Sequence, residues 1–146
     1  MTFDTRAPRT VAVSRDEKTL YVGESDNVPG GTRELRAYRL EAREVVGSPR
    51  VMHTFGEDYR GVHRGVEGLT LDGEGNVLAC AGWERSGPGP MVYVFVPSGE
   101  IAGSHRVPAD MPVACAFGGA DLGTLYVTTA AGVLLAVRGS GLRGAH

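Results

Sequence analysis

The stretch Gly68-Leu-Thr-Leu-Asp-Gly-Glu-Gly-Asn-Val-Leu-Ala-Cys80 decides the fold, because it reads as an apolar strand, a tight turn and a second apolar strand. The turn, Asp72-Gly-Glu-Gly-Asn76, holds the residue types that hairpins need. The same pattern recurs at residues 10–22 and 115–127, and the equivalent leucines at 20, 78 and 125 are 58 and 47 residues apart. Repeats of sheet-forming units at such spacings are typical of propeller blades.

Outward from these hairpins, further strands are expected at residues 33–40, 51–55, 91–96, 101–107 and 132–138. The predicted fold is therefore all-β: a β-propeller segment of about three four-stranded antiparallel blades, half of a six-bladed propeller. The blades are expected at about 8–56, 66–108 and 112–146, as one segment. The third ends before a fourth strand has room to form.

Three blades do not close a ring, because closed propellers usually have about four to eight. The chain is expected to be part of a longer product, to assemble, or to tolerate an open edge. One hypothesis is a head-to-tail homodimer that completes a six-bladed ring.

Composition excludes several classes of function. With 15 basic and 17 acidic residues the formal charge is −2, so no basic face is indicated and nucleic acid is not an expected partner. No run of signal-peptide or membrane-span length occurs, which predicts a soluble, cytoplasmic product without a membrane partner. Cys80 and Cys115 lie in apolar patterns, which favours buried free thiols over a disulfide between neighbouring blades.

Strand topology indicates where a site lies. In an up-and-down blade the first strand begins on the face where the second ends, so Arg9, Glu67 and Ala114 share one rim. The loops that start at Glu24 and Trp83 lie on the same rim. The first of them is longer than a hairpin needs, and such loops are often functional.

Several motifs resemble the calcium-dependent lactonases that include gluconolactonase, senescence marker protein (regucalcin) and luciferin-regenerating enzyme. The resemblance is carried by four segments, residues 14–22, 65–76, 92–99 and 112–128. The most specific is Ala116-Phe-Gly-Gly119 followed by Thr124-Leu-Tyr-Val-Thr128. The resemblance as a whole covers about residues 8–138 and matches the C-terminal half of a family propeller.

The resemblance implies metal ligands at the starts of the inner strands. An asparagine ligand of the family is replaced here by Arg9, a polar ligand position is occupied by Ala114, and the family's aspartate, ligand and general base, corresponds to Glu67. The implied cofactor is a divalent metal, Ca²⁺, held by Glu67 and Asn27. Substrate-binding residues are expected to be Glu24, Asp26, Arg9 and Trp83.

Two functions from different classes remain. The first is calcium-dependent hydrolysis of a sugar lactone, with Glu67 as ligand and base and a small-molecule lactone or sugar acid as partner. The second is a non-catalytic propeller module that binds a small molecule or a partner protein, which Arg9 and Ala114 favour. A third reading is a truncated remnant without activity of its own.

Overall fold

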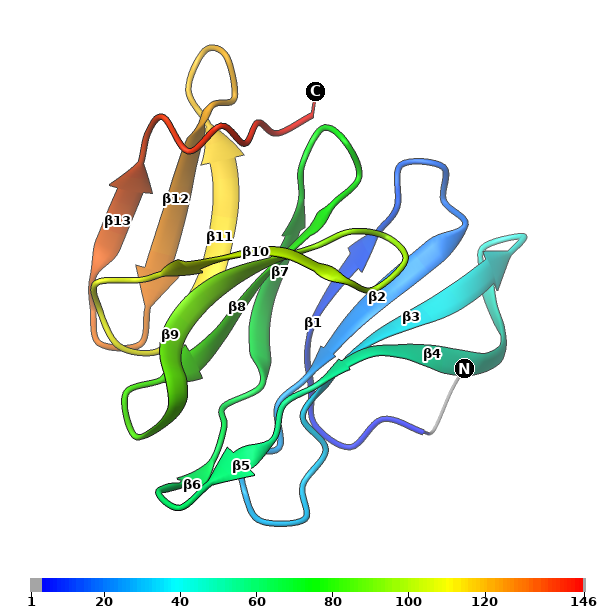
Figure 1. The fold of residues 1–146 in the computed structure, drawn as a ribbon. Helices are drawn as coiled ribbons and strands as arrows, with labels where there is room; N and C mark the ends of the chain where they lie inside the picture. The colour runs from blue at the N-terminus through cyan, green and yellow to red at the C-terminus, as the bar shows by residue number, and fades with distance from the viewer. Residues whose placement is uncertain (1–3, 146) are drawn as a thin grey trace.

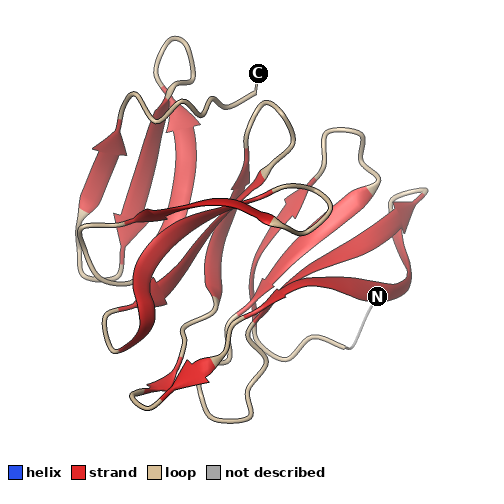
Figure 2. Cartoon of the chain, viewed as in Figure 1, coloured by secondary structure: helices blue, strands red, loops and turns tan. Residues whose placement is uncertain are grey.

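The computed structural model describes residues 4–145, which form strands joined by loops and turns, as Figures 1 and 2 show. No helix occurs in this range, and so none that could cross a membrane. The strands are β1 (Pro8–Val13), β2 (Thr19–Glu24), β3 (Glu34–Glu41), β4 (Glu44–Thr54), β5 (Glu57–Asp58), β6 (Gly61–Val62), β7 (Val66–Leu71), β8 (Val77–Trp83), β9 (Ser86–Phe95), β10 (Ile101–Arg106), β11 (Pro112–Gly118), β12 (Thr124–Thr129) and β13 (Leu134–Val137).

Three antiparallel meanders make up the fold. Strands β1–β4 and β7–β10 form four-stranded sheets, and β11–β13 form a three-stranded sheet. The innermost strands β1, β7 and β11 pack in that order, with β7 between the other two. This confirms the all-β propeller segment, and Figure 1 shows the three sheets fanned without closing into a ring.

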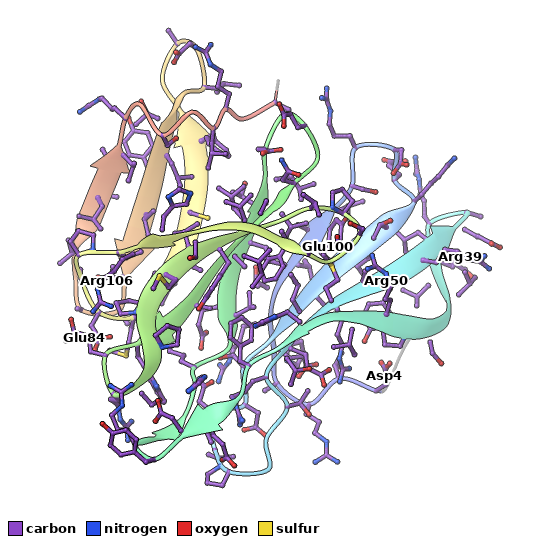
Figure 3. All side chains as sticks on the ribbon, viewed as in Figure 1. Asp4, Arg39, Arg50, Glu84, Glu100 and Arg106 are labelled. Carbon is purple, nitrogen blue, oxygen red and sulfur yellow. The ribbon has the colours of Figure 1, made fainter. Side chains whose placement is uncertain are left out.

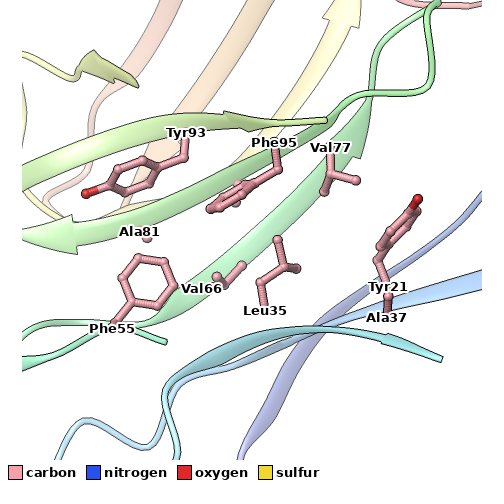
Figure 4. Packing of buried hydrophobic residues seen from close by; sticks show 10 residues of the cluster. Tyr21, Leu35, Ala37, Phe55, Val66, Val77, Ala81, Tyr93 and Phe95 are labelled. Atoms are coloured by element: carbon pink, nitrogen blue, oxygen red, sulfur yellow. The ribbon is translucent and has the colours of Figure 1, made fainter. Parts of the chain in front are cut away.

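Each interface between neighbouring sheets has its own apolar core. The first contains Tyr21, Leu35, Phe55, Tyr93 and Phe95, which Figure 4 shows converging from both sheets. The second core joins the sheets of β7–β10 and β11–β13 and consists of Leu78, Cys80, Val92, Val94, Val107, Leu125 and Val127. Alternate residues of each strand point to one face, which is why the apolar runs supply one core on each side of the middle blade.

The inner strands approach so closely that glycine is required between them. A β-carbon built on Gly68 would lie 2.4 Å from the carbonyl oxygen of Val113 on β11. One built on Gly23 would lie 2.6 Å from a methyl carbon of Val66 on β7. Backbone, not side chain, blocks the space at Gly68, so a larger residue there would push two blades apart.

Three hairpins differ from the sequence expectation. Strand β4 begins at Glu44, well before the expected 51–55, because Ala42 and Arg43 turn the chain with φ of 49° and 67°. That two-residue turn carries none of the glycine or asparagine that usually marks it. Similarly, Trp83 pairs with Ser86, so the loop expected at 83–90 is a tight turn followed by β9. The short β5–β6 hairpin was also not predicted.

Strand β4 is fastened to the second blade by Arg50. Its guanidinium donates to the carbonyl oxygens of Ser98 at 2.6 Å and Pro97 at 2.7 Å, in the β9–β10 turn. Figure 3 shows Arg50 beside Glu100 of that turn. The contact holds the outer edges of the two blades together.

Both cysteines are free thiols, as expected, with Cys80 buried and Cys115 half-buried. The hydrogen bond that the Cys80 thiol makes to Cys115, together with burial, raises the pKa of Cys80. The pair lies in the second core and away from the rim.

Candidate functional site

Glu67 is the second residue of β7 and lies at the rim where the inner strands begin, which are the lower ends of β1, β7 and β11 in Figure 1. Its carboxylate oxygen Oε1 accepts a hydrogen bond from the Ser25 hydroxyl at 2.7 Å and one from the Asn27 amide nitrogen at 3.4 Å. The side chain is 17% exposed. A carboxylate oriented by neighbouring donors and still reachable from solvent can accept a proton from a bound molecule.

Arg64 is the buried cation of the site. Its Nε lies 3.6 Å from Glu67 Oε1, while Nη1 donates to the carbonyl oxygens of Gly82 at 3.0 Å and Pro112 at 2.8 Å. Burial lowers the pKa of Arg64, and the negative charge of Glu67 opposes that effect. One guanidinium therefore joins the second and third blades and faces the carboxylate.

Arg9 approaches Glu67 from the other side. Its Nε lies 4.0 Å from Glu67 Oε2, and its side chain is 55% exposed. Its guanidinium makes no hydrogen bond to any residue of the described chain. The pair is long and open to water, so the attraction between its two charges is weak.

The loop between β2 and β3 is held in one shape under the rim. The Asn27 side-chain oxygen accepts from the Gly65 backbone nitrogen at 2.9 Å, which turns the amide NH₂ toward Glu67. Arg33 lies buried beneath the loop and donates to the carbonyl oxygen of Val28 at 2.9 Å. The donors that meet Glu67 are thus fixed before any ligand binds.

Of the other expected substrate contacts, Glu24 is fully buried. Its carboxylate accepts backbone N–H groups of Arg6 and Ala7 at 3.2 and 2.8 Å, so it holds the N-terminal segment against the first blade. Asp26 contributes mainly backbone bonds that close the loop, such as its N–H to the Thr32 oxygen at 2.9 Å. The geometry therefore gives Glu24 a structural contact and leaves a substrate contact of Asp26 as a prediction.

Trp83 lines a cavity of about 180 Å³ on the same rim, together with Asn27, Arg60 and Arg85. The Arg85 guanidinium lies 4.7 Å from the centre of the indole ring. The indole nitrogen donates to the Ser86 hydroxyl at 2.8 Å. Asn27 borders both this cavity and Glu67, so the cavity adjoins the rim loop, and a substrate contact of Trp83 stays a prediction.

A calcium ion does not fit the described residues. Calcium takes six to eight oxygen ligands. Glu67 supplies one carboxylate with two arginines and two hydrogen-bond donors directed at it, and Asn27 offers its NH₂ there instead of its oxygen. Within residues 4–145, no three His, Cys, Asp or Glu side chains gather closely enough for a metal.

Sequence reasoning missed two residues of the site, Ser25 and Arg64. Ser25 follows directly on Glu24 in the long loop, and Arg64 stands three residues before Glu67. Their proximity to Glu67 arises from the packing of the β2–β3 loop over β7, which no pattern in the sequence reports. We define the rim site as Arg9, Ser25, Asn27, Arg64 and Glu67.

The chain is similar in sequence to two proteins that are named as lactonases. The chain is 30% identical to a gluconolactonase of Zymomonas mobilis over 76% of this chain and 29% of that protein. It is 31% identical to the pentonolactonase XacC of Haloferax volcanii over 86% of this chain and 38% of that one. The chain thus spans well under half the length of these relatives.

Solved structures share the fold. A luciferin-regenerating enzyme superposes with a TM-score of 0.75 at 23% identity, over 97% of this chain and 48% of that chain. Regucalcin of Agrobacterium tumefaciens, described as a calcium-binding protein, gives a TM-score of 0.73 at 22% identity, with the same coverage. The family described as the SMP-30/gluconolactonase/LRE-like region matches residues 1–131. With its sheets, its motifs and this match, the chain belongs to the SMP-30/gluconolactonase/LRE-like family.

Proposed function

We propose that this chain acts in the hydrolysis of a sugar lactone, with Glu67 as the general base. The observation that carries the proposal is the Glu67 carboxylate, oriented by Ser25 and Arg64 at the rim and still partly exposed. Support comes from the relatives named gluconolactonase and pentonolactonase. Glu67 stands where the sequence resemblance implies the family's base.

In this reaction Glu67 accepts one proton from water and later donates it to the ring oxygen of the lactone. A water molecule attacks the lactone carbonyl carbon while Glu67 takes its proton, and the carbonyl oxygen becomes negative. When the bond from that carbon to the ring oxygen breaks, the proton passes to the ring oxygen. The product is an open-chain hydroxy acid.

Calcium, which the family resemblance implies, would polarise the carbonyl and lower the pKa of a bound water. The expected ligands were Glu67 and Asn27. Because the described residues do not fit such an ion, the proton transfers are assigned to Glu67 without a step through a metal.

The test is hydrolysis of glucono-δ-lactone, followed by acid release in a pH-stat. Glu67→Gln should lower the enzymatic rate by at least about a hundredfold, because a general base contributes 10² to 10⁴. Glu41→Gln is the matched control, since Glu41 is exposed and paired with Arg39 on strand β3. Equal rates for the wild type and Glu67→Gln would refute the assignment.

We also propose that a second copy completes the ring. Ala12 and Leu135 face the inner cores, so the exposed Val11 and Leu134 point from the two open flanks of the segment. A head-to-tail pair would place one flank on the other and bury both. Light scattering should then give twice the monomer mass of 15.4 kDa, and a monomer at high concentration would contradict the pairing.

A further inference from the structure

Glu67 lies between two cations, one buried and one exposed. Two guanidinium groups face one carboxylate: Arg64 at 3.6 Å and Arg9 at 4.0 Å. Arg64 is buried and neutralises Glu67 at close range, with its remaining contacts made to carbonyl oxygens. The negative charge of Asp110 also acts on Arg64, so Arg9 is the exposed cation of the rim site and is set against Glu67 alone.

Arg9 is also the member of the rim site whose donors are free. Its side chain is 55% exposed and hydrogen-bonds to no residue of the described chain. A guanidinium presents five N–H donors in a planar fork that matches the two oxygens of a carboxylate. Arg9 is the second residue of β1 and lies beside Oε2 of Glu67. That oxygen accepts no hydrogen bond from the described residues.

A divalent cation and Arg9 compete for the same place. A metal on Glu67 Oε2 would lie within a few ångströms of the Arg9 guanidinium, and like charges at that distance repel. An anion there would instead be attracted by the positive charge of Arg9, and also by that of Arg64, which is buried on the other side of Glu67. The arrangement favours an anionic ligand over a cationic one.

We propose that Arg9 takes the place of a metal ion in this site. It binds the carbonyl oxygen of the lactone and then the carboxylate of the product acid, without a divalent cation. This inference rests on the proposed function, which supplies the lactone as the substrate. During ring opening, the Arg9 N–H groups donate to the oxygen on which negative charge develops, while Glu67 holds the proton removed from water. The aldonic acid that results gives up its carboxyl proton to water, and its carboxylate lies against Arg9 as a charge-assisted pair.

The experiment measures binding of D-gluconate to the full chain by isothermal titration calorimetry in 150 mM NaCl with EDTA present. Sorbitol, a neutral polyol of similar size, is the ligand control. Gluconate should bind and sorbitol should not. Arg9→Gln should weaken gluconate binding at least tenfold, because the fork and its charge are lost together.

Arg39→Gln is the matched protein control, because Arg39 is an exposed arginine paired with one glutamate, at the far end of the first blade from the rim. Its gluconate affinity should stay within twofold of the wild type. Glu67→Gln should bind gluconate more tightly than the wild type, since a like charge beside the ligand has been removed.

Several results would overturn the inference: no binding of gluconate in EDTA, binding that appears only when calcium is added, or equal affinities for the wild type and Arg9→Gln. Failure of the proposed function gives a different pattern. Gluconate would then bind through Arg9 in EDTA while no lactone is hydrolysed, which would identify the rim as an anion-binding module.

Discussion

Replacement of Arg64 by lysine tests whether one buried guanidinium holds the blades and the rim site together. The arginine donates from Nη1 to Gly82 of the second blade and to Pro112 of the third, while Nε faces Glu67. Lysine keeps the positive charge but ends in a single nitrogen on a flexible chain. It can replace at most part of this set, because the guanidinium atoms that make these contacts diverge.

The magnitude follows from the contacts that are lost. Hydrogen bonds to a charged group contribute about 1.5–3 kcal/mol each, so losing one or two predicts a destabilisation of about 3 kcal/mol. For a chain of this size, about 2–4 °C of melting temperature per kcal/mol gives a decrease of about 6–12 °C. The assay is thermal unfolding followed by circular dichroism, with urea unfolding for the free energy.

The control is Arg39→Lys, because Arg39 is 71% exposed and makes one surface ion pair at 2.9 Å from Glu41. Its stability should change by less than about 0.5 kcal/mol. If Arg64→Lys unfolded at the wild-type temperature, the guanidinium would not be a structural link between blades, and its role beside Glu67 would need another explanation.

Gly68→Ala should destabilise the chain by more than about 2 kcal/mol in urea unfolding, since the new β-carbon meets backbone of β11, whereas Gly56→Ala, with open space around it, should be tolerated. Leu78→Ala should cost about 2–5 kcal/mol because its side chain is fully buried, while Leu134→Ala, exposed on the flank, should change stability little in a monomer. Burial lowers the pKa of His53 below its usual 6.5. The unfolded state therefore binds the proton more readily, so stability is complete above pH 6.5 and declines as the pH falls below it, and His53→Gln should flatten that decline in a series of unfolding curves.

Much of the fold could be predicted because strand alternation and turn residues are local properties. Wherever a turn carried glycine, asparagine or aspartate, as at Asp72, the expected hairpin is present. The failures were also local: the turn at Ala42 and Arg43 adopts positive φ without those residues, so β4 was predicted too short. The segment after Trp83 was predicted to be a loop because it is rich in proline and glycine. Those residues instead lie within β9.

The site could be predicted in part. The rim position of Glu67 followed from the order of strands, and so did the approach of Asn27 and Arg9. The direction of each side chain did not follow. Glu24 turns inward to bind backbone N–H groups, while its neighbour Ser25 reaches Glu67.

What the sequence by itself determined is therefore the repeated strand-turn-strand unit, the three blades and the placement of one acid at the start of the middle inner strand. These depend on residue spacing along the chain, which sequence displays directly. Only the tertiary structure decided that Arg64 and Arg9 would face that acid from two sides, and that its other neighbours would be hydrogen-bond donors. The physical reason is that charge balance at a point depends on distances between separate strands and loops, and those are set by how blades pack.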